Sequence, residues 1–533
     1  MEQMTSTQNM EHTTAPDRLV SALWKRCKAE WKRAFFAAFI VGMLTHAYMF
    51  TNNLLTWDSM FSLYAPQEMT GLGRPFLRLL CAVSTDFNLP MVLGTLSVLY
   101  MSLTAAALTE CFSIRSRVGS VLTGAITAVF PVVSGTFCYL FTADGYMFAF
   151  FLSVLSVVLA EKAKGSAKQR IAWTMAGAVA LAVSLGIYQA YFAVAITLCI
   201  LKLLLFLLQE PEKREELVAG FFRQMGRYLI MGGVGYVLYL ILVRVSQSIM
   251  GTELLSYNGV DRIGNFELAD VPRGIYTAYR QFFSFAFRSN VLTTNGVMTV
   301  CFAGLAVVGA GIFLCRLFRC REKRWKRLAM AAVLVILLPA GATIFCVMSP
   351  DVFIYILLRM PWLLLFLFVL ALAEQGKAVV QTTVTVLTAV MAFEFYLMSN
   401  VVYFNMNEKY EKSYALCVRL ADRIEQKEEY YPWMKTLFIG AEPDYRKYPS
   451  AEVTDEVLAG YYPARSNYFL NSTDKYLEFF AHYLNISLAP VSEEEEKALL
   501  KRDEVQAMDT FPAENSVQVI DGVMVIKMSE EEE

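Results

Sequence analysis

Asp58 is the residue whose type and position most directly suggest chemistry. It follows the first long apolar run, residues 34–50, and precedes a polar segment that ends in Gly73-Arg74-Pro75. A charge beside a bilayer is costly and usually functional, and here it could be a general base that deprotonates an acceptor hydroxyl attacking a sugar carbon. One carboxylate suffices when a phosphate leaves, whereas glycoside hydrolysis needs a second carboxyl as acid. The structural alternative is a helix cap or an interfacial carboxylate.

Four other polar residues are predicted near outer turns and could bind substrate. Arg74, in a Gly-Arg-Pro turn, suits a phosphate because arginine can offer paired hydrogen bonds. Asp144, in an Asp-Gly pair that favours a tight turn, could help to bind a metal or an acceptor. Tyr188 and Gln189 share another short turn, where they could hydrogen-bond to a sugar. Each of these residues also has an ordinary structural explanation in a turn or at an interface.

Arg359 lies six residues into a predicted membrane span. An arginine at that depth is expensive unless it faces a polar cavity or an anion, so we predict that it binds phosphate. Snorkelling to the membrane surface is the alternative. Arg244, Arg280 and Arg288 are secondary candidates for the same role. Arg280 and Arg288 belong to an aromatic and basic stretch within residues 249–293, whose spacing suits a helix in the headgroup region.

The sequence gives little support for a metal centre. It has ten cysteines but only three histidines, so a zinc site built from histidine and cysteine is not expected. A metal would have to use carboxylate oxygens, which favours a divalent cation such as magnesium or manganese. No cofactor is certain, and the metal ligands remain unknown.

Composition places most of the chain in a membrane. The 533 residues are 56% hydrophobic and 18% charged, whereas soluble proteins carry about 25% charged residues. Apolar runs of about 20 residues, the length of a membrane-crossing helix, recur along the chain. The net charge of −1 gives no indication of a nucleic-acid partner. About eleven spans are predicted, at 34–54, 89–110, 118–137, 146–161, 171–187, 190–208, 228–248, 294–315, 328–347, 353–373 and 379–401.

Lysine and arginine are concentrated in every second loop, and this alternation predicts the orientation of the chain in the membrane. Basic loops include residues 25–33, 162–170 and 316–327. The alternate loops 138–145, 188–189 and 348–352 have no lysine or arginine. The N-terminus is therefore predicted inside and the C-terminus outside, with Asp58 and Asp144 on the outer side.

These patterns predict a mainly α polytopic membrane protein with a small C-terminal α/β domain. The predicted parts are a cytoplasmic segment 1–33, a transmembrane domain 34–402 with outer loops 51–88 and 249–293, and an extracytoplasmic domain 403–533. In the last part, residues 407–427 read as an amphipathic helix. Residues 516–528 alternate around Asp521-Gly522, which favours a two-residue hairpin turn.

The order and predicted topology of five short motifs resemble the bacterial type II glucosyl transferases of the Gtr group, which modify O-antigen and other surface glycans. The motifs are Trp57-Asp58, Gly73-Arg74-Pro75, Asp144-Gly145, Tyr188-Gln189 and Leu358-Arg359-Met360-Pro361. More broadly the chain is similar to the GT-C superfamily, whose members use a polyprenyl-phosphate sugar as donor.

The resemblance implies a GT-C-like fold in the bacterial cytoplasmic membrane and an inverting sugar transfer on its outer face. The acid that this family carries in its first outer loop would be Asp58. A polyprenyl-phosphate sugar, with glucose as the default, would be the donor, and a surface glycan the acceptor. Membrane lipids, a companion enzyme that makes the donor, and a flippase would be the other partners.

Two other functions remain open at this point. One is a transporter or flippase that moves a lipid-linked sugar. Such a protein should show paired broken helices or internal repeats, and neither is clear here. The other is a different GT-C enzyme, such as a lipid A sugar transferase or a protein mannosyltransferase.

Overall fold

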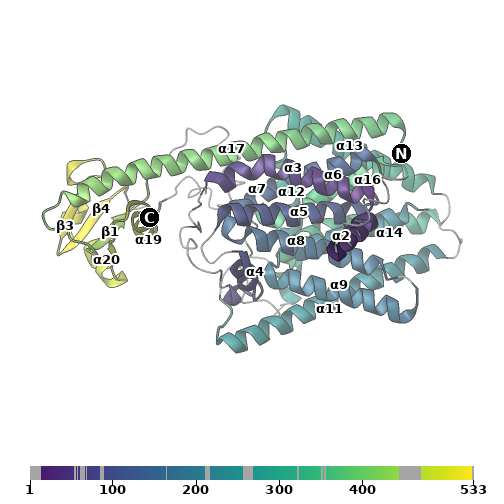
Figure 1. Ribbon diagram of the computed structural model, residues 1–533, viewed down its shortest axis with the longest axis horizontal. Helices are drawn as coiled ribbons and strands as arrows, with labels where there is room; N and C mark the ends of the chain where they lie inside the picture. The colour runs from purple at the N-terminus through teal and green to yellow at the C-terminus, as the bar shows by residue number, and fades with distance from the viewer. Residues whose placement is uncertain are drawn as a thin grey trace.

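Helices account for most of the structure, which is a computed structural model (Figure 1). It describes residues 14–52, 54, 56, 58–59, 67, 69–84, 89–163, 165–209, 216–255, 268–320, 323–349, 352, 354, 356–442 and 470–530. Parts of the predicted outer loops, and residues 443–469 of the predicted C-terminal domain, lie outside these residues. Long helices form a bundle, and α17 (Ala378–Glu425) leaves it and leads to a small sheet near the C-terminus.

The first half of the described chain is helical throughout. Its helices are α2 (Ala15–Arg26), α3 (Ala29–Asn52), η2 (Thr70–Leu72), α4 (Leu77–Ser84), α5 (Pro90–Cys111), α6 (Arg117–Val129), α7 (Pro131–Phe137), α8 (Leu140–Glu161), α9 (Ala167–Ile187), α10 (Tyr191–Leu207) and α11 (Glu216–Met250).

The second half adds further helices and the four strands. Its helices are η4 (Leu268–Asp270), α12 (Val271–Phe287), α13 (Gly296–Arg319), α14 (Arg324–Ala342), α15 (Ile344–Met348), η5 (Ile356–Arg359), α16 (Pro361–Ala373), α17, α19 (Thr473–Phe479), η6 (Phe480–Leu484), α20 (Glu493–Leu499), α21 (Asp503–Gln506) and η7 (Glu514–Ser516). The strands are β1 (Lys435–Ile439), β2 (Ala489–Pro490), β3 (Val517–Ile520) and β4 (Val523–Lys527).

Among the described residues, nine helices are long and apolar enough to cross a membrane. The number rises to ten if α6 and α7, which meet at a bend of 42°, form one broken span. Helix α10 is apolar but has only 17 residues. Each predicted span overlaps one of these helices, but the count of eleven stays a prediction. The chain is a polytopic membrane protein at this level of detail.

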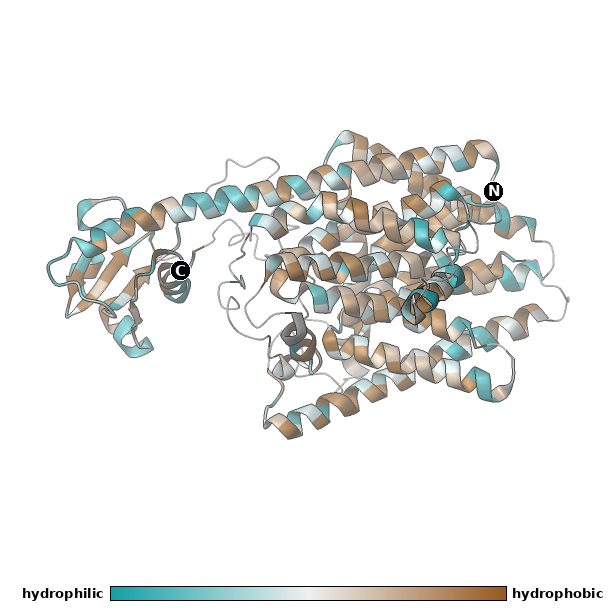
Figure 2. Cartoon of the chain, in the orientation of Figure 1, coloured by the Kyte–Doolittle hydropathy of each residue, from teal (hydrophilic) through white to brown (hydrophobic). Residues whose placement is uncertain are grey.

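The outer surface of the bundle is apolar, as Figure 2 shows along most of its helices. Leu44 and Val307, for example, are 67% and 72% exposed. Such surfaces are favourable when lipid chains rather than water surround the helices. Inside the bundle, small residues allow close crossings. A Cβ at Gly124 of α6 would lie 2.3 Å from the carbonyl oxygen of Ala34 on α3, so a larger residue there would push the two helices apart.

Several predicted spans differ from the helices in shape. Pro131 begins α7 after the bend, because proline lacks the N–H and the space that a continuing helix needs. Residues 353–373 were predicted as one span, but a 3₁₀ turn, η5, precedes α16. Helix α17 runs unbroken for 48 residues, so the predicted span 379–401 and the predicted helix 407–427 are one element.

The four strands beyond α17 form a mixed sheet in the order β2-β1-β4-β3. Strand β1 is parallel to both β2 and β4, and β3 and β4 are antiparallel. Asp521 and Gly522 between them have φ values of 52° and 76°, the signs that a type I′ turn requires. The hairpin predicted at this pair is therefore confirmed. The boundary of the predicted domain 403–533 stays a prediction.

The bundle has two ends. The tail-side end is the end from which α17 leaves, where α3 and α9 finish at Asn52 and Ile187 (Figure 1). The far end is the opposite one, where α5 and α8 finish at Cys111 and Glu161.

Candidate functional site

Asp58 lies in a turn just beyond the end of α3, at the tail-side end. Ser59 closes this turn, because its N–H donates to the carbonyl oxygen of Thr56 (3.1 Å) and its Oγ accepts from the Thr56 N–H (2.7 Å). The Thr56 hydroxyl also donates to the carbonyl oxygen of Cys138, at 3.3 Å. The turn that carries Asp58 is thus attached to the end of α7.

The Asp58 side chain is partly buried and experiences opposing electrostatic effects. Burial raises the pKa of its carboxyl above the ordinary value, and the ammonium of Lys475 acts in the opposite direction. Asp58 is also close enough to Tyr146 on α8 to act on that side chain electrostatically. Lys475 belongs to α19, so part of the chain beyond α17 lies within electrostatic reach of Asp58.

Arg74 is the centre of a second group at the tail-side end. The preceding residue, Gly73, has a φ of 69°, a conformation that favours glycine and supports the predicted fixed turn. The Arg74 Nε donates to Gln189 Oε1 at 3.2 Å, and its Nη1 donates to the Tyr146 hydroxyl at 3.0 Å. Its guanidinium also lies 4.7 Å from the centre of the Tyr188 ring. The structure therefore brings together three predicted site residues, Arg74, Tyr188 and Gln189.

The neighbours of Arg74 are themselves held by the protein. The Gln189 amide nitrogen donates to the carbonyl oxygens of Leu72 and Gly73, at 2.8 and 3.1 Å. The Tyr188 and Tyr146 rings stack with their centres 4.1 Å apart. Gln189 and Tyr188 therefore orient Arg74, which makes the guanidinium the group best placed to meet an anionic ligand.

The predicted position of Asp144 in a tight outer turn was wrong. Helix α8 begins at Leu140, so the Asp-Gly pair lies inside the helix and Asp144 is buried. A Cβ at Gly145 would lie 2.8 Å from Leu77 Cδ1, so the glycine lets the Leu77 side chain of α4 pack close to α8. The Cys81 thiol of α4 contacts the Asp144 carboxylate at 3.9 Å. Any role of Asp144 in binding metal or acceptor stays a prediction.

Arg359 ends the 3₁₀ turn η5 and is only 7% exposed. Its Nη1 donates to the carbonyl oxygen of Gln281 at 2.9 Å, and its Nη2 donates to Gln281 Oε1 at 2.7 Å. The guanidinium lies 5.4 Å from the centre of the Phe285 ring, also on α12. Protein groups therefore offset much of the cost of burying this arginine.

Helix α7 connects the surroundings of Arg359 with the turn of Asp58. Residues of η5 pack against α7, and Cys138 at the end of α7 accepts the hydrogen bond from Thr56. The Cys138 Sγ also lies 3.7 Å from the Sδ of Met406 on α17. The predicted cooperation of Arg359 with Arg74 stays a prediction.

The secondary candidates lie on the surface. Arg244 is exposed near the end of α11, Arg280 is exposed on α12, and Arg288 is exposed directly after α12. The predicted helix in residues 249–293 is present as α12. It buries Phe282 and Phe285 in the bundle, whereas Tyr276, Phe283 and Phe287 are exposed. Exposed aromatics beside arginines suit a position at a membrane surface.

The described residues contain no group of three or more histidine, cysteine or acidic side chains that could hold a metal ion. His46, the buried histidine of α3, contacts the Tyr403 hydroxyl at 2.7 Å and the carbonyl oxygen of Ala128 at 2.9 Å. It is therefore a packing residue with both ring nitrogens engaged.

Sequence reasoning missed Tyr146, Gln281 and Lys475. Tyr146 stands two positions after Asp144, and its place among aromatic residues near the start of a predicted span could have drawn attention to it. Gln281 gives no signal in the sequence, because a single amide on an aromatic helix does not indicate its partner. Lys475 lies more than 400 residues from Asp58 along the chain, so only the folded arrangement connects them.

Comparison with known proteins adds one finding. Residues 47–393 match the family described as glucosyl transferase GtrII. No curated protein and no solved structure matches the chain. The family match includes Asp58, Arg74, Asp144, Tyr188, Gln189 and Arg359. Because it covers more than half of the 533 residues, the chain belongs to the GtrII glucosyl transferase family and is a glycosyltransferase.

Proposed function

We propose that this glycosyltransferase moves a hexose, by default glucose, from a polyprenyl-phosphate donor to a cell-surface glycan. The reaction takes place on the outer face of the bacterial cytoplasmic membrane. The observation that supports this best is the convergence of Asp58 with the group around Arg74 at one end of the bundle. A carboxylate for the acceptor and a guanidinium for the donor phosphate are the two groups that the transfer needs.

The reaction is a single displacement. The acceptor hydroxyl oxygen attacks C1 of the donor sugar, and the bond from C1 to the phosphate oxygen breaks. Asp58 takes the hydroxyl proton, and the polyprenyl phosphate leaves with the electron pair of the broken bond. Attack from the side opposite the phosphate inverts the configuration at C1. Burial raises the pKa of Asp58, which makes it a stronger base than an exposed aspartate.

Arg74 and Arg359 bind the donor phosphate in this proposal. Their positions at the tail-side end, and their fork-shaped guanidinium groups, support the role. The exposed aromatic face of α12 would contact the lipid chain or headgroups near Arg280 and Arg288. A separate enzyme and a flippase would supply the donor on the outer face. The part of the chain beyond α17 would select the acceptor, which fits the proximity of Lys475 to Asp58.

Two features support the proposed orientation. The basic loops gather at the far end, as expected of the cytoplasmic side, and Asp58 lies at the other end. Membership of a glycosyltransferase family also favours an enzyme over the transporter considered above. A different GT-C reaction, such as transfer to lipid A, remains the alternative for the acceptor.

The decisive experiment compares Asp58→Asn with wild type. Purified protein would be tested with a panel of polyprenyl-phosphate sugars and a surface glycan as acceptor. We expect transfer to fall at least about a hundredfold, the usual effect of losing a general base, with donor affinity and folding nearly unchanged. Asp144→Asn should have a smaller effect, and Asp503→Asn, which changes an exposed residue of α21, should have none. Normal transfer by Asp58→Asn would refute the role of Asp58.

A further inference from the structure

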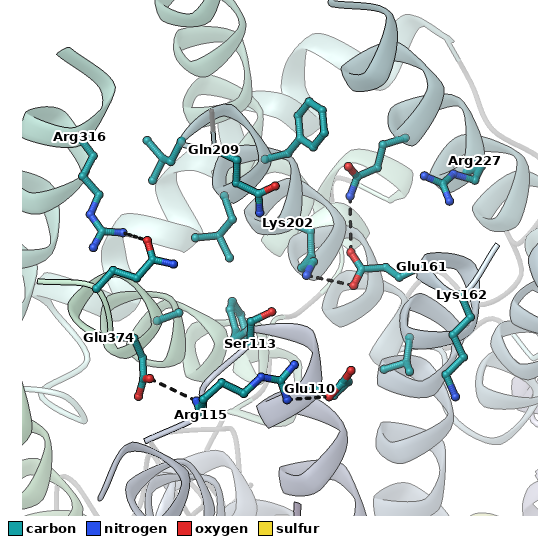
Figure 3. A pocket seen from close by; sticks show the side chains of 18 residues that line it. Glu110, Ser113, Arg115, Glu161, Lys162, Lys202, Gln209, Arg227, Arg316 and Glu374 are labelled. Atoms are coloured by element: carbon teal, nitrogen blue, oxygen red, sulfur yellow. Dashed lines mark hydrogen bonds and ion pairs between the residues drawn. The ribbon is translucent and has the colours of Figure 1, made fainter. Parts of the chain in front are cut away.

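The far end of the bundle contains a large polar cavity that the transfer reaction does not use. Its volume is about 1040 Å³, at the upper limit of typical small-molecule sites, which span about 300–1,000 Å³. The ends of α5, α8, α10, α13 and α16 and the first part of α11 surround it (Figure 3). Five of the lining side chains are cationic and three are anionic.

The three carboxylates of this cavity already have protein partners. Glu110, Glu161 and Glu374 each accept hydrogen bonds from a nearby helix or helix end. The bonds include Lys28 Nζ to Glu110 Oε1 (2.8 Å), Lys202 Nζ to Glu161 Oε2 (3.0 Å) and the Arg115 N–H to Glu374 Oε2 (3.2 Å). They neutralise Lys202 and, through Glu110, the Arg115 guanidinium. In the described part of the chain, Glu374 accepts only from backbone N–H groups and the Ser116 hydroxyl, so five cationic against three anionic side chains leave the lining with an excess of two positive charges.

Three lining cations, Lys162, Arg227 and Arg316, pair with no carboxylate among the described residues. Arg316 Nη1 donates only to an amide oxygen, that of Gln375 at 3.4 Å. Arg227 Nη1 donates to a backbone carbonyl oxygen at 3.0 Å, which orients the guanidinium. The Arg227 Nε is buried and has no hydrogen-bond partner, so protein atoms cover it and only the terminal nitrogens of this guanidinium are available to a ligand in the cavity.

We propose that this far-end cavity is a second binding site, for a phosphate-bearing anion. Arginine binds phosphate oxygens through paired hydrogen bonds, and Arg227 and Arg316 line the cavity from two different helices, α11 and α13. A basic loop on the cytoplasmic side is common. A cavity of about 1040 Å³ lined by three cations that pair with no carboxylate among the described residues is a more specific feature. The site lies at the opposite end of the bundle from Asp58, so it is independent of the transfer chemistry.

The phosphate could belong to a lipid headgroup or to a soluble compound. The apolar side chains Leu205, Phe206 and Leu208 also line the cavity, and the helix ends place it near headgroup level. Both sources share the chemistry of a phosphate held by arginine, so the experiment must separate them.

The test uses the full-length protein in detergent and follows its thermal unfolding midpoint. Inorganic pyrophosphate, with sodium chloride at equal ionic strength as control, represents the soluble source. Phosphatidylglycerol, with phosphatidylcholine as control, represents the lipid source. A ligand that binds the folded state raises the midpoint. We expect at least one of the two probes to do so, and that probe identifies the source.

Variants show whether the rise of the unfolding midpoint caused by a probe depends on this cavity. In Arg227→Gln/Arg316→Gln, the probe concentration needed for the same shift should rise at least about tenfold, because charged hydrogen bonds are lost. Arg170→Gln, an exposed residue of α9 outside the cavity, should respond like wild type. Arg74→Gln removes part of the proposed donor site instead, so a response that is lost there and kept in the double variant would assign the probe to the donor site and count against the cavity.

Two results would overturn the proposal. One is that neither probe stabilises the wild type beyond its control. The other is an unchanged response in the double variant. If that variant does not fold, Lys162→Gln replaces it, because the Lys162 side chain is exposed and its replacement should not disturb folding. A normal response in Lys162→Gln would then count against the site.

Discussion

Arg74 donates its Nε–H to Oε1 of Gln189 at 3.2 Å, although the two residues are 115 positions apart in the chain. The bond joins the segment between η2 and α4 to the break between α9 and α10. Gln189 in turn donates to the carbonyl oxygens of Leu72 and Gly73, in the turn that precedes Arg74. A guanidinium fixed in this way loses little conformational freedom when it binds a ligand, which favours tight binding.

Arg74→Lys should weaken donor binding at least about tenfold, although it keeps the positive charge. Lysine cannot reproduce the hydrogen bonds that Arg74 makes in two directions, to Gln189 and to Tyr146. The measurement is the affinity for a polyprenyl-phosphate sugar. Arg78→Lys is the matched control, because Arg78 is exposed on the adjacent α4 and should not affect binding. If Arg78→Lys lowers donor affinity as much as Arg74→Lys does, the loss is a general effect of replacing arginine by lysine. Arg74 would then not be a specific donor-binding residue.

Arg359→Ala should weaken donor binding more than acceptor binding. Arg359 is nearly buried, and Gln281 fixes it through two hydrogen bonds. Gln281→Leu removes one of these bonds and should cause a smaller loss of donor affinity, about threefold or more. Donor and acceptor affinities are measured separately for both variants. An unchanged donor affinity in Arg359→Ala would exclude the phosphate-binding role.

The pH dependence of transfer should report Asp58. A base must be ionised to accept a proton, so the rate should rise with pH as the carboxyl ionises. Burial raises the pKa of Asp58, which places this rise above the ordinary value of about 3.9. Lys475 opposes this shift, so Lys475→Gln should move the rise to higher pH.

The rate at high pH provides the internal control for this prediction, because Asp58 is ionised there in both proteins. That rate should be nearly the same in Lys475→Gln and in wild type. Lys497→Gln, which changes an exposed lysine of α20, should leave the pH profile unchanged. A shift to lower pH in Lys475→Gln would contradict the proposed electrostatic interaction.

Reporter fusions at Lys377 and Glu408 should report opposite sides of the membrane. Both residues belong to one straight element, since Lys377 caps the start of α17 and Glu408 lies within it. At 1.5 Å per residue they are about 47 Å apart, more than the hydrocarbon thickness of about 30 Å. A fusion at Lys377 should be inside and one at Glu408 outside. The reverse result would place Asp58 on the inner side and remove its access to a surface glycan.

The sequence predicted the helical membrane bundle well, because composition and apolar run length depend on the solvent rather than on details of packing. It also predicted that Arg74, Tyr188 and Gln189 lie in short outer turns. Turns at the same end of a bundle tend to meet, and these three do. The hairpin at Asp521 was predictable because its turn type requires particular residues.

Other features could not be predicted, for identifiable reasons. The Asp144-Gly145 pair was placed in a turn because such pairs favour turns, but α8 begins at Leu140, and Gly145 packs closely against Leu77 inside that helix. The pairing of Arg359 with Gln281 depends on how two distant helices pack. The polar residues after Tyr403 suggested a new domain, but they are good helix formers, so the helix simply continues.

The unbroken α17 fixes both the distance and the rotational angle of the sheet relative to the membrane. Its 48 residues correspond to about 72 Å, so roughly 40 Å of helix extends beyond a hydrocarbon layer of about 30 Å. Each residue also turns the helix by about 100°. One inserted residue in this extension would therefore swing the sheet around the helix axis, whereas seven would raise it by two turns in almost the original direction. The number of residues in the extension therefore sets both the height of the sheet above the membrane and its direction around the helix axis.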